Sequence, residues 1–352
     1  MPSFIQSANL LPPRMDLDLQ NALTPTPHPL EADPLPRSKS NTGAPAGISS
    51  PANRRRRWFH NDSAMFWLMM SPAILGFLTF SAGPMLSSLY LSCTKYDVVS
   101  SPRWVGVDNY LYLLRHDPAF WPSVKVTAVY AAVSVPLSLV IALLIAMLLN
   151  QRIFARNLFR TIFFLPTLLP ATASGVVWVW IFDPTRGLLN HALASVGILG
   201  PAWMHSTTWA LPALIIMSLW GFGGAMIIFL AGLQEVPRQL YEAAELDGAG
   251  SWNQFYHVTL PMISPVLFFN LVMGIIGALK AFDLAFVTST AAGAGAGGPA
   301  RATLFYTLNL YQKSFNYFHM GLGSAMAWML FAAILLLTAI NFVLGKRWVH
   351  TS

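Results

Sequence analysis

Residues 126–151 read VTAVYAAVSVPLSLVIALLIAMLLNQ, which is 26 positions without a charged side chain. A helix needs roughly 20 apolar residues to cross the hydrocarbon core of a bilayer. The run is continuously apolar rather than alternating, which argues against a strand of a membrane β-barrel. The stretch therefore predicts a transmembrane helix.

Runs of the same kind recur on both sides of this one. Of the 352 residues, 55% are hydrophobic and only 10% are charged, whereas about a quarter of a soluble domain is charged. We predict an all-α polytopic membrane protein with about six spans, near residues 64–91, 126–149, 161–182, 209–233, 262–289 and 320–344. The alternative is one large soluble helical core, and six separate runs of spanning length argue against it.

The N-terminal segment differs in composition from everything after it. Residues 1–57 hold ten of the 25 prolines and few large apolar side chains. Such a segment cannot bury enough surface to offset its chain entropy. We expect a disordered cytoplasmic tail at 1–57, which is a solvated linker or a docking segment, followed by a transmembrane domain at 58–350.

Basic residues indicate how the spans are oriented. Arg54–Arg57 stand directly before the first span, and cytoplasmic segments are enriched in arginine and lysine. An even number of spans returns the C-terminus, with Lys346 and Arg347, to the same side. On this topology ten basic residues lie inside and seven outside. The sequence therefore predicts that both termini are cytoplasmic.

The loop between the fourth and fifth spans, residues 234–261, carries the most information. Its charges require it to leave the membrane, and the topology places it in the cytoplasm. Pro237 suits a helix start, and Gly248 suits a left-handed helix end. Ser251 is predicted to cap a second helix, with Gln254 completing a capping box. We expect a helix–turn–helix that projects into the cytoplasm.

The residues of this loop resemble the EAA loop of ABC importer permeases. The resemblance rests on Glu242-Ala243-Ala244-Glu245-Leu246-Asp247-Gly248-Ala249, followed by Phe255 and Leu260-Pro261. Three further stretches are similar to the sugar-type, maltose-like branch of that family: 230–237 (LAGLQEVP), 106–110 (GVDNY) and 281–283 (AFD). The likeness covers roughly residues 60–350 and leaves out the tail.

The resemblance implies a permease subunit of a binding-protein-dependent importer in the bacterial plasma (inner) membrane, for a sugar or related polyol. It implies as partners a second permease, two copies of a cytoplasmic ATP-binding subunit and a periplasmic or lipoprotein solute-binding protein. Glu242 would contact the ATPase, Ala243 and Ala244 would fit its cleft, and Gly248 would form the turn. The whole set of coupling residues expected from the family is Glu242, Ala243, Ala244, Glu245, Asp247, Gly248, Leu260 and Pro261.

The chain is not expected to be an enzyme or to hold a cofactor of its own. It has no phosphate-binding Walker loop, so ATP would be bound and hydrolysed on the partner ATPase. Its histidines show no pair at metal-ligand spacing. The glycines of 291–298 fit a dinucleotide pattern without a preceding strand, and they are read instead as a flexible insertion that faces the solute-binding protein. Besides membrane lipids and these subunits, no nucleic-acid partner is expected.

Candidates for the solute pathway come from the fourth and fifth spans. Polar residues at membrane depth usually face a cavity or a partner, and aromatic rings beside exposed backbone suit sugar rings. The candidates are Trp220, Gly221, Gly224, Asn270, Lys280, Phe282 and Asp283, with Asn309 weaker. Two structural alternatives stay open: Lys280 and Asp283 pair with each other, and the glycines only let helices pack closely.

Two competing functions remain. A permease for amino acids, peptides or ions would share the loop, although the sugar-like residues around it argue against that class. A membrane-embedded enzyme would need a polar catalytic constellation at membrane depth, for which Lys280 and Asp283 alone are too little.

Overall fold

The computed structural model describes residues 62–151, 153–291, 293, 295 and 297–346. The predicted tail at 1–57, with Arg54–Arg57, lies outside these residues. The chain divides into two compact units, residues 1–67 and 68–352. Of the described residues, 62–67 belong to the first unit and all others to the second.

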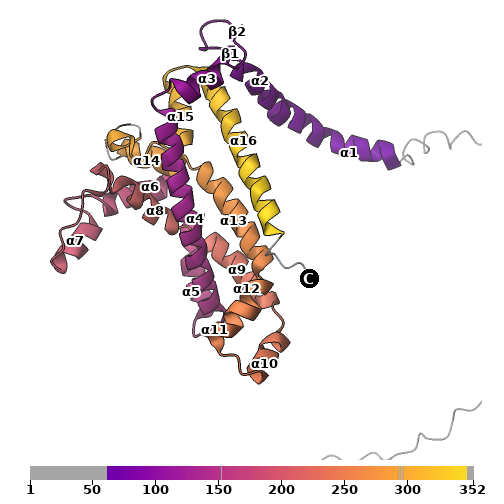
Figure 1. Ribbon diagram of the computed structural model, residues 1–352, viewed down its shortest axis with the longest axis vertical. Coiled ribbons are helices and arrows are strands. Elements are labelled where there is room, and N and C mark those ends of the chain that lie inside the picture. The colour runs from indigo at the N-terminus through magenta and orange to yellow at the C-terminus, as the bar shows by residue number, and fades with distance from the viewer. Residues whose placement is uncertain (1–61, 152, 292, 294, 296, 347–352) are drawn as a thin grey trace, which may run out of the picture. The chain divides into compact units, whose positions relative to one another are not determined.

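Helices account for most of the described structure. Within the described residues, four helical stretches are long and apolar enough to cross a membrane: Met65–Ser92, Phe120–Asn150, Ser264–Thr290 and Met320–Gly345. Two further pairs pass the same test but are bent: Arg156–Leu168 with Ala171–Ile181, and Ala210–Leu219 with Gly223–Glu235. Each bent pair, counted as one span, brings the total to six. The protein is an all-α polytopic membrane protein, as the sequence predicts (Figure 1).

The first span is built from three helical pieces. They are α1 (Asp62–Phe77), a π-helical segment (Leu78–Ala82) and α2 (Gly83–Ser92). The end of this span packs against α16 (Met320–Gly345) through α2. A short antiparallel hairpin follows, with β1 (Thr94–Lys95) paired to β2 (Arg103–Trp104), and then α3 (Asp108–Arg115).

The centre of the second unit is α4 (Phe120–Asn150), the longest helix among the described residues. It packs against α8 (Ala210–Leu219), α9 (Gly223–Glu235) and α13 (Ser264–Leu279). Figure 1 shows α13 running beside α4, and α16 beside α13. Ala142 and Ala146 of α4 are fully buried in this core. Small side chains let helix backbones approach closely, which is the main source of helix association where no water is displaced.

The third predicted span, 161–182, is not one straight helix. The chain forms α5 (Arg156–Phe164), a 3₁₀ turn (Leu165–Leu168) and α6 (Ala171–Ile181), with a bend of 100° between the two halves. The bend falls at Leu169, which is extended because it precedes Pro170. A proline pair therefore breaks the span where hydropathy alone shows an unbroken run.

A polar turn leads from α6 to α7 (Leu188–Ser195). The Asp183 carboxylate accepts hydrogen bonds from the backbone N–H groups of Arg186, at 2.7 Å, and Thr185, at 2.9 Å. These bonds favour the ionised form and lower the pKa of Asp183 below its usual value. A 3₁₀ turn (Trp203–His205) then precedes α8.

The fourth predicted span, 209–233, is the other bent pair. Its halves α8 and α9 meet at 44° across residues 220–222. Gly223 opens α9, and a Cβ there would lie 2.4 Å from the carbonyl oxygen of Phe163 at the end of α5. Only glycine fits at this close approach, so the break brings α9 against the backbone of the preceding bent span.

The last third of the chain completes the second unit. It contains α10 (Arg238–Leu246), α11 (Ser251–Gln254), a π-helical segment (Phe255–Thr259), α12 (Leu260–Met262), α13, α14 (Asp283–Ala291), a 3₁₀ turn (Pro299–Arg301), α15 (Tyr306–Tyr311), a π-helical segment (Gln312–Asn316) and α16. Residues 292, 294 and 296 of the predicted glycine-rich insertion lie outside the described residues. The helix α14 packs on α6, and α15 packs on both α4 and α16.

Asn109 holds the polar connection between the first two spans. Its side-chain amide donates to the carbonyl oxygens of Ser92 and Thr94, both at 2.8 Å, and it is buried. These bonds join α3 to the end of α2 and the start of β1. Asn109 belongs to the GVDNY stretch that resembles the sugar-type branch, and its role here is structural.

We predict that Asn109→Ala destabilises this connection, because two buried carbonyl groups lose their donor. The expected loss is about 2 kcal/mol of unfolding free energy. Thermal unfolding of the purified protein in detergent measures it. Asp108→Ala, one residue away at an exposed position, is the matched control, and equal melting temperatures for the two variants would contradict the role given to Asn109.

Candidate functional site

The candidate site has two parts, a helical elbow at one end of the molecule and a cavity in the middle of the spans. We define the elbow as residues 237–259, which connect α9 to α12. The cavity lies among α4, the junction of α8 and α9, and α13. The elbow follows α9 and leads through α12 into α13, and both α9 and α13 contribute walls of the cavity.

The first half of the elbow follows the sequence prediction closely. Pro237 caps the start of α10 with extended backbone, and the helix runs from Arg238 to Leu246. Gly248 then takes a φ of +79°. The N–H of Ala249 bonds to the carbonyl of Ala244, and the N–H of Gly248 bonds to that of Glu245. This pair of bonds is a Schellman motif, which ends a helix on a left-handed residue.

The predicted cap of the second helix is wrong. Ser251 is the first residue of α11, and Gly250 occupies the capping position without a side-chain hydrogen bond. The Gln254 side chain bonds instead to the carbonyl oxygen of Ala249 at 3.2 Å. The chain leaves the Schellman turn already extended at Gly250, so the helix starts one residue earlier than a Ser251 cap would require.

The elbow presents an uncovered surface of mixed character. None of the residues of α10 is buried, and Glu242, Ala243, Glu245 and Asp247 are exposed. Large apolar side chains stand beside these carboxylates, with Leu246 90% exposed and Trp252 75% exposed. Ala244, Leu260 and Pro261 are half-buried. Exposed aromatic and aliphatic side chains among acidic ones are typical of a surface that a protein partner covers.

A hydrogen bond braces the elbow internally, and the two ends of the elbow continue into the spans. The Tyr241 hydroxyl lies 2.9 Å from the Thr259 hydroxyl, which joins α10 to the π-helical segment. On the other side, Val236 is buried between α9 and α10. From Ser251 the chain stays helical through the π segment into α12, and α13 follows directly at Ser264. The elbow is therefore tied to both spans that it connects.

The cavity has a volume of about 460 Å³ and mixes polar with apolar walls. Its lining residues are Tyr130, Ser134, Val135, Ser138, Leu139, Ser218, Gly221, Ala225, Ile228, Asn270, Met273, Gly274, Gly277 and Ala278. Its polar groups are hydroxyls and one amide, and none of the described residues that line it is charged. A pocket of this size with a few converging polar groups suits a small neutral polar molecule.

Two of the predicted pathway residues, Gly221 and Asn270, line this cavity. Gly221 stands at the break between α8 and α9. Asn270 is buried on α13, and its amide donates to the carbonyl oxygen of Val266 at 3.0 Å. The broken helix exposes backbone groups beside the cavity, as is common where transporters bind their solutes.

The other predicted pathway residues do not line the cavity. Trp220 packs edge-on against Trp178, with ring centroids 5.8 Å apart. Gly224 faces open space. Phe282 stacks on Phe286 at 5.3 Å and also touches Tyr311.

The break between α13 and α14 exposes two charged side chains. Lys280 and Asp283 stand on either side of this break. They form no ion pair in the part of the chain that the structure describes, where Lys313 and Asp117 make the one ion pair. Their side chains are therefore available to solvent or to another molecule.

Three polar side chains that α4 contributes to the cavity wall were not predicted from the sequence. Tyr130, Ser134 and Ser138 recur every four residues, so they lie on one face of the helix, and all three line the cavity. This spacing inside an uncharged span is the signal that could have identified them. Ser218, two residues before the candidate Trp220, is a further wall residue that composition alone does not single out.

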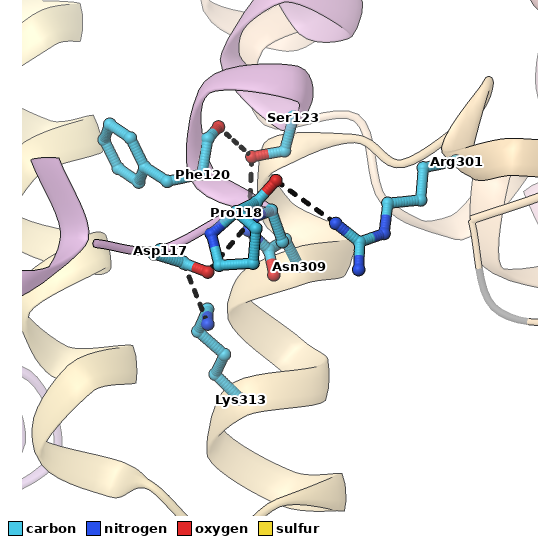
Figure 2. Close-up of polar contacts among 8 residues, drawn as sticks. Asp117, Pro118, Phe120, Ser123, Arg301, Asn309 and Lys313 are labelled. Atoms are coloured by element: carbon cyan, nitrogen blue, oxygen red, sulfur yellow. Dashed lines mark hydrogen bonds and ion pairs between the residues drawn. The ribbon is translucent and has the colours of Figure 1, made fainter. Parts of the chain in front are cut away.

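A polar joint fixes the start of α4 at the end of the molecule opposite the elbow (Figures 1 and 2). Lys313 pairs with Asp117 at 2.9 Å, and both side chains are largely buried. The Arg301 guanidinium donates to the carbonyl oxygen of Pro118 at 3.1 Å, and Asn309 donates to the Ser123 hydroxyl at 3.2 Å. Asn309, a weak pathway candidate, therefore joins α15 to α4.

Comparison with known proteins places this architecture in a family. A family model described as "Binding-protein-dependent transport system inner membrane component" matches residues 135–350, which include the elbow and most of the residues that line the cavity. The chain belongs to this family. The permease is, as the sequence predicts, similar to sugar-type ABC importer permeases, which are transport components and not enzymes themselves.

Its relatives are similar over most of their length. The permease is 41% identical over 306 residues to the probable ABC transporter permease protein YesP of Bacillus subtilis (strain 168), covering 86% of this chain and 97% of that protein. It is 31% identical to the probable starch degradation products transport system permease protein AmyD of Thermoanaerobacterium thermosulfurigenes, with 82% and 96% covered. It is 32% identical to the trehalose/maltose transport system permease protein MalF of Thermococcus litoralis, with 82% and 95% covered.

Solved structures share the fold. A chain of a bacterial ABC transporter involved in the import of the acidic polysaccharide alginate aligns with a TM-score of 0.69 at 22% identity, over 83% of the permease and 96% of that chain. A chain from the alginate transporter in complex with a pentasaccharide-bound periplasmic protein aligns with a TM-score of 0.71 at 20% identity, over 85% and 97%. At this identity the likeness supports the fold alone.

We predict that Gly248→Ala loosens the elbow, because an L-residue at φ +79° is strained by about 1 kcal/mol. Hydrogen exchange of the purified permease should become faster across residues 244–250. Gly250→Ala is the matched control, since Gly250 has a φ of −70° and open space around it. Equal exchange in the two variants would show that the left-handed turn does not hold the elbow.

Proposed function

We propose that the permease forms, with a second permease, the pathway of a binding-protein-dependent importer for a neutral sugar or related polyol. Hydrolysis of ATP on two copies of a separate cytoplasmic subunit drives it, and a periplasmic or lipoprotein solute-binding protein delivers the solute. The observation that carries the proposal is the elbow: an uncovered helical projection joined directly to two walls of a polar cavity. The chain lies in the bacterial plasma membrane with both termini cytoplasmic.

The elbow supplies the coupling. Glu242, Glu245 and Asp247 offer carboxylates to basic groups of the ATPase, and the small Ala243 permits close approach at an exposed position. Leu246 and Trp252 add exposed apolar surface, and its burial against the docked partner would favour binding. Gly248 forms the turn of the elbow. Leu260 and Pro261, at the start of α12, transmit movement of the elbow to α13.

The cavity indicates the class of solute. Hydroxyl groups of Ser134, Ser138 and Ser218, with the Asn270 amide, can exchange hydrogen bonds with sugar hydroxyls. A charged solute would need an opposite charge in the wall, because an unpaired charge at membrane depth is costly. The described lining has none, which favours a neutral polyhydroxy solute over an amino acid, an ion or an acidic sugar.

Two alternatives are weaker. A permease for another solute class is compatible with the elbow but not with a lining that offers only hydroxyl and amide groups. A membrane-embedded enzyme would need reactive groups in the cavity, and the charged residues Lys280 and Asp283 do not line it.

The first test concerns the ATPase. Glu242→Lys reverses a charge at the exposed contact, and we expect about a tenfold loss of ATPase co-purifying with the permease in detergent. Asp108→Lys reverses an exposed carboxylate on α3, away from the elbow, and should leave the yield unchanged. Full retention of the ATPase by the Glu242→Lys variant would refute the docking assignment.

The second test concerns the solute. Asn270→Leu removes an amide from the cavity wall and should lower uptake of the radiolabelled solute into proteoliposomes by about tenfold, since a bound hydroxyl loses its partner. Asn341→Leu is a matched control, because Asn341 of α16 also donates to the carbonyl four residues earlier but is not part of the cavity wall. Uptake is measured with the assembled importer and a panel of sugars. Equal uptake rates for the Asn270→Leu and Asn341→Leu variants would show that the solute pathway does not pass through this cavity.

A further inference from the structure

A second hollow of the permease is apolar and lies between two of its spans. It has a volume of about 310 Å³, and its walls come from α4 and α16. Leu279, at the end of α13, and Tyr306 of α15 contribute to it as well. We call it the side groove, and its lining residues are Leu114, Phe120, Trp121, Val124, Thr127, Ala128, Leu279, Tyr306, Met329, Leu330, Ala333 and Leu337.

The side groove extends along α4 and α16 from the end at which α4 begins. Along α16 it extends from Met329 to Leu337, which is about 12 Å at 1.5 Å per residue. Trp121 stands near the start of α4, 56% exposed, and its indole N–H donates to the carbonyl oxygen of Leu114 at 2.9 Å. Tryptophan at such a position is typical of the headgroup level of a bilayer.

An unpaired cation lies beside the side groove. Lys125 is exposed, four residues after Trp121 and three before Ala128, so it shares the helix face of two lining residues. Arg115, also exposed, directly follows the lining residue Leu114. The carboxylate of the turn that joins α3 to α4, Asp117, is already paired with Lys313. A lysine this close to the hydrocarbon is stabilised when its ammonium reaches an anion at the interface.

We propose that the side groove binds a phospholipid with an anionic headgroup. One acyl chain lies along α4 and α16, and the phosphate contacts Lys125 and Arg115. A helix of another subunit fits less well, since a helix is about 10 Å across and packs best on small residues. The walls carry large side chains such as Trp121, Met329 and Leu337, and a docked helix would have to neutralise Lys125.

The test places a photoreactive benzoylphenylalanine at Ala128 of the full-length permease in its native membrane. Ala128 lines the groove and is exposed. Irradiation and mass spectrometry should identify an adduct with an anionic phospholipid, enriched over the bulk membrane by about fivefold for each basic side chain that contacts it. The same probe at Ala332, exposed on α16 but outside the groove, should report the bulk lipid composition.

Charge and shape are then varied separately. Lys125→Gln should lower the anionic enrichment at Ala128, whereas Lys95→Gln, at an exposed lysine of β1, should not. Ala333→Phe fills the groove and should release one tightly bound lipid seen by native mass spectrometry of the purified importer. Ala332→Phe is its control.

Three outcomes would overturn the proposal. The first is a polypeptide adduct at Ala128, which would make the side groove a subunit interface. The second is the same lipid composition at Ala128 and Ala332. The third is full retention of the bound lipid by the Ala333→Phe variant.

Discussion

The close packing of α4 against α9 and α13 is the constraint on which the rest of the structure depends. In a bilayer, helices gain little from leaving lipid, so they associate where small residues allow dense packing. A Cβ added at Gly232 of α9 would lie 2.8 Å from the Val266 side chain of α13, and one at Gly274 would lie 3.0 Å from Val135 of α4. These glycines therefore set how near the three helices come, and hence the size of the cavity between them.

The same packing explains why the cavity is polar without being charged. Serine and alanine alternate with larger residues along the inward face of α4, because bulky side chains would separate it from α13. A serine hydroxyl in a helix can bond to a carbonyl of the preceding turn, as Ser218 does to that of Ile215 at 2.7 Å, and so costs little when no solute is present. Small hydroxyl residues thus allow close helix packing and supply polar groups to the cavity at one position, whereas a buried charge would be costly there.

Much of this architecture could be predicted from the sequence, and the failures have physical causes. Uncharged runs predict spans because a bilayer excludes charge, and the elbow is predictable because Pro237 and Gly248 act through their own backbone preferences. The 100° bend at Leu169 does not show in hydropathy, which carries no information on direction, and only Pro166 and Pro170 beside it indicate a kink. Only part of the cavity wall was predicted. Gly221 and Asn270 differ from the apolar residues of their spans, whereas Ser134 and Ser138 are recognised as wall residues only when the position of α13 opposite them is known. The Ser251 cap failed because the preceding glycine turn fixed where the helix could start.

The junction between the elbow and the spans is the physical connection between Glu242 or Trp252 and the cavity. At this junction, five residues from Phe255 to Thr259 are π-helical, a wider conformation than the α-helix, with hydrogen bonds from i to i+5, that occurs where helices kink. Left alone, such a segment would absorb displacement. The bond between Tyr241 and Thr259 spans it from the outside and ties α10 to its last residue, and Ile263, directly before α13, is fully buried in the core. The α10 helix is therefore tied directly to the chain that enters α13, where Asn270 and Gly274 stand in the cavity wall.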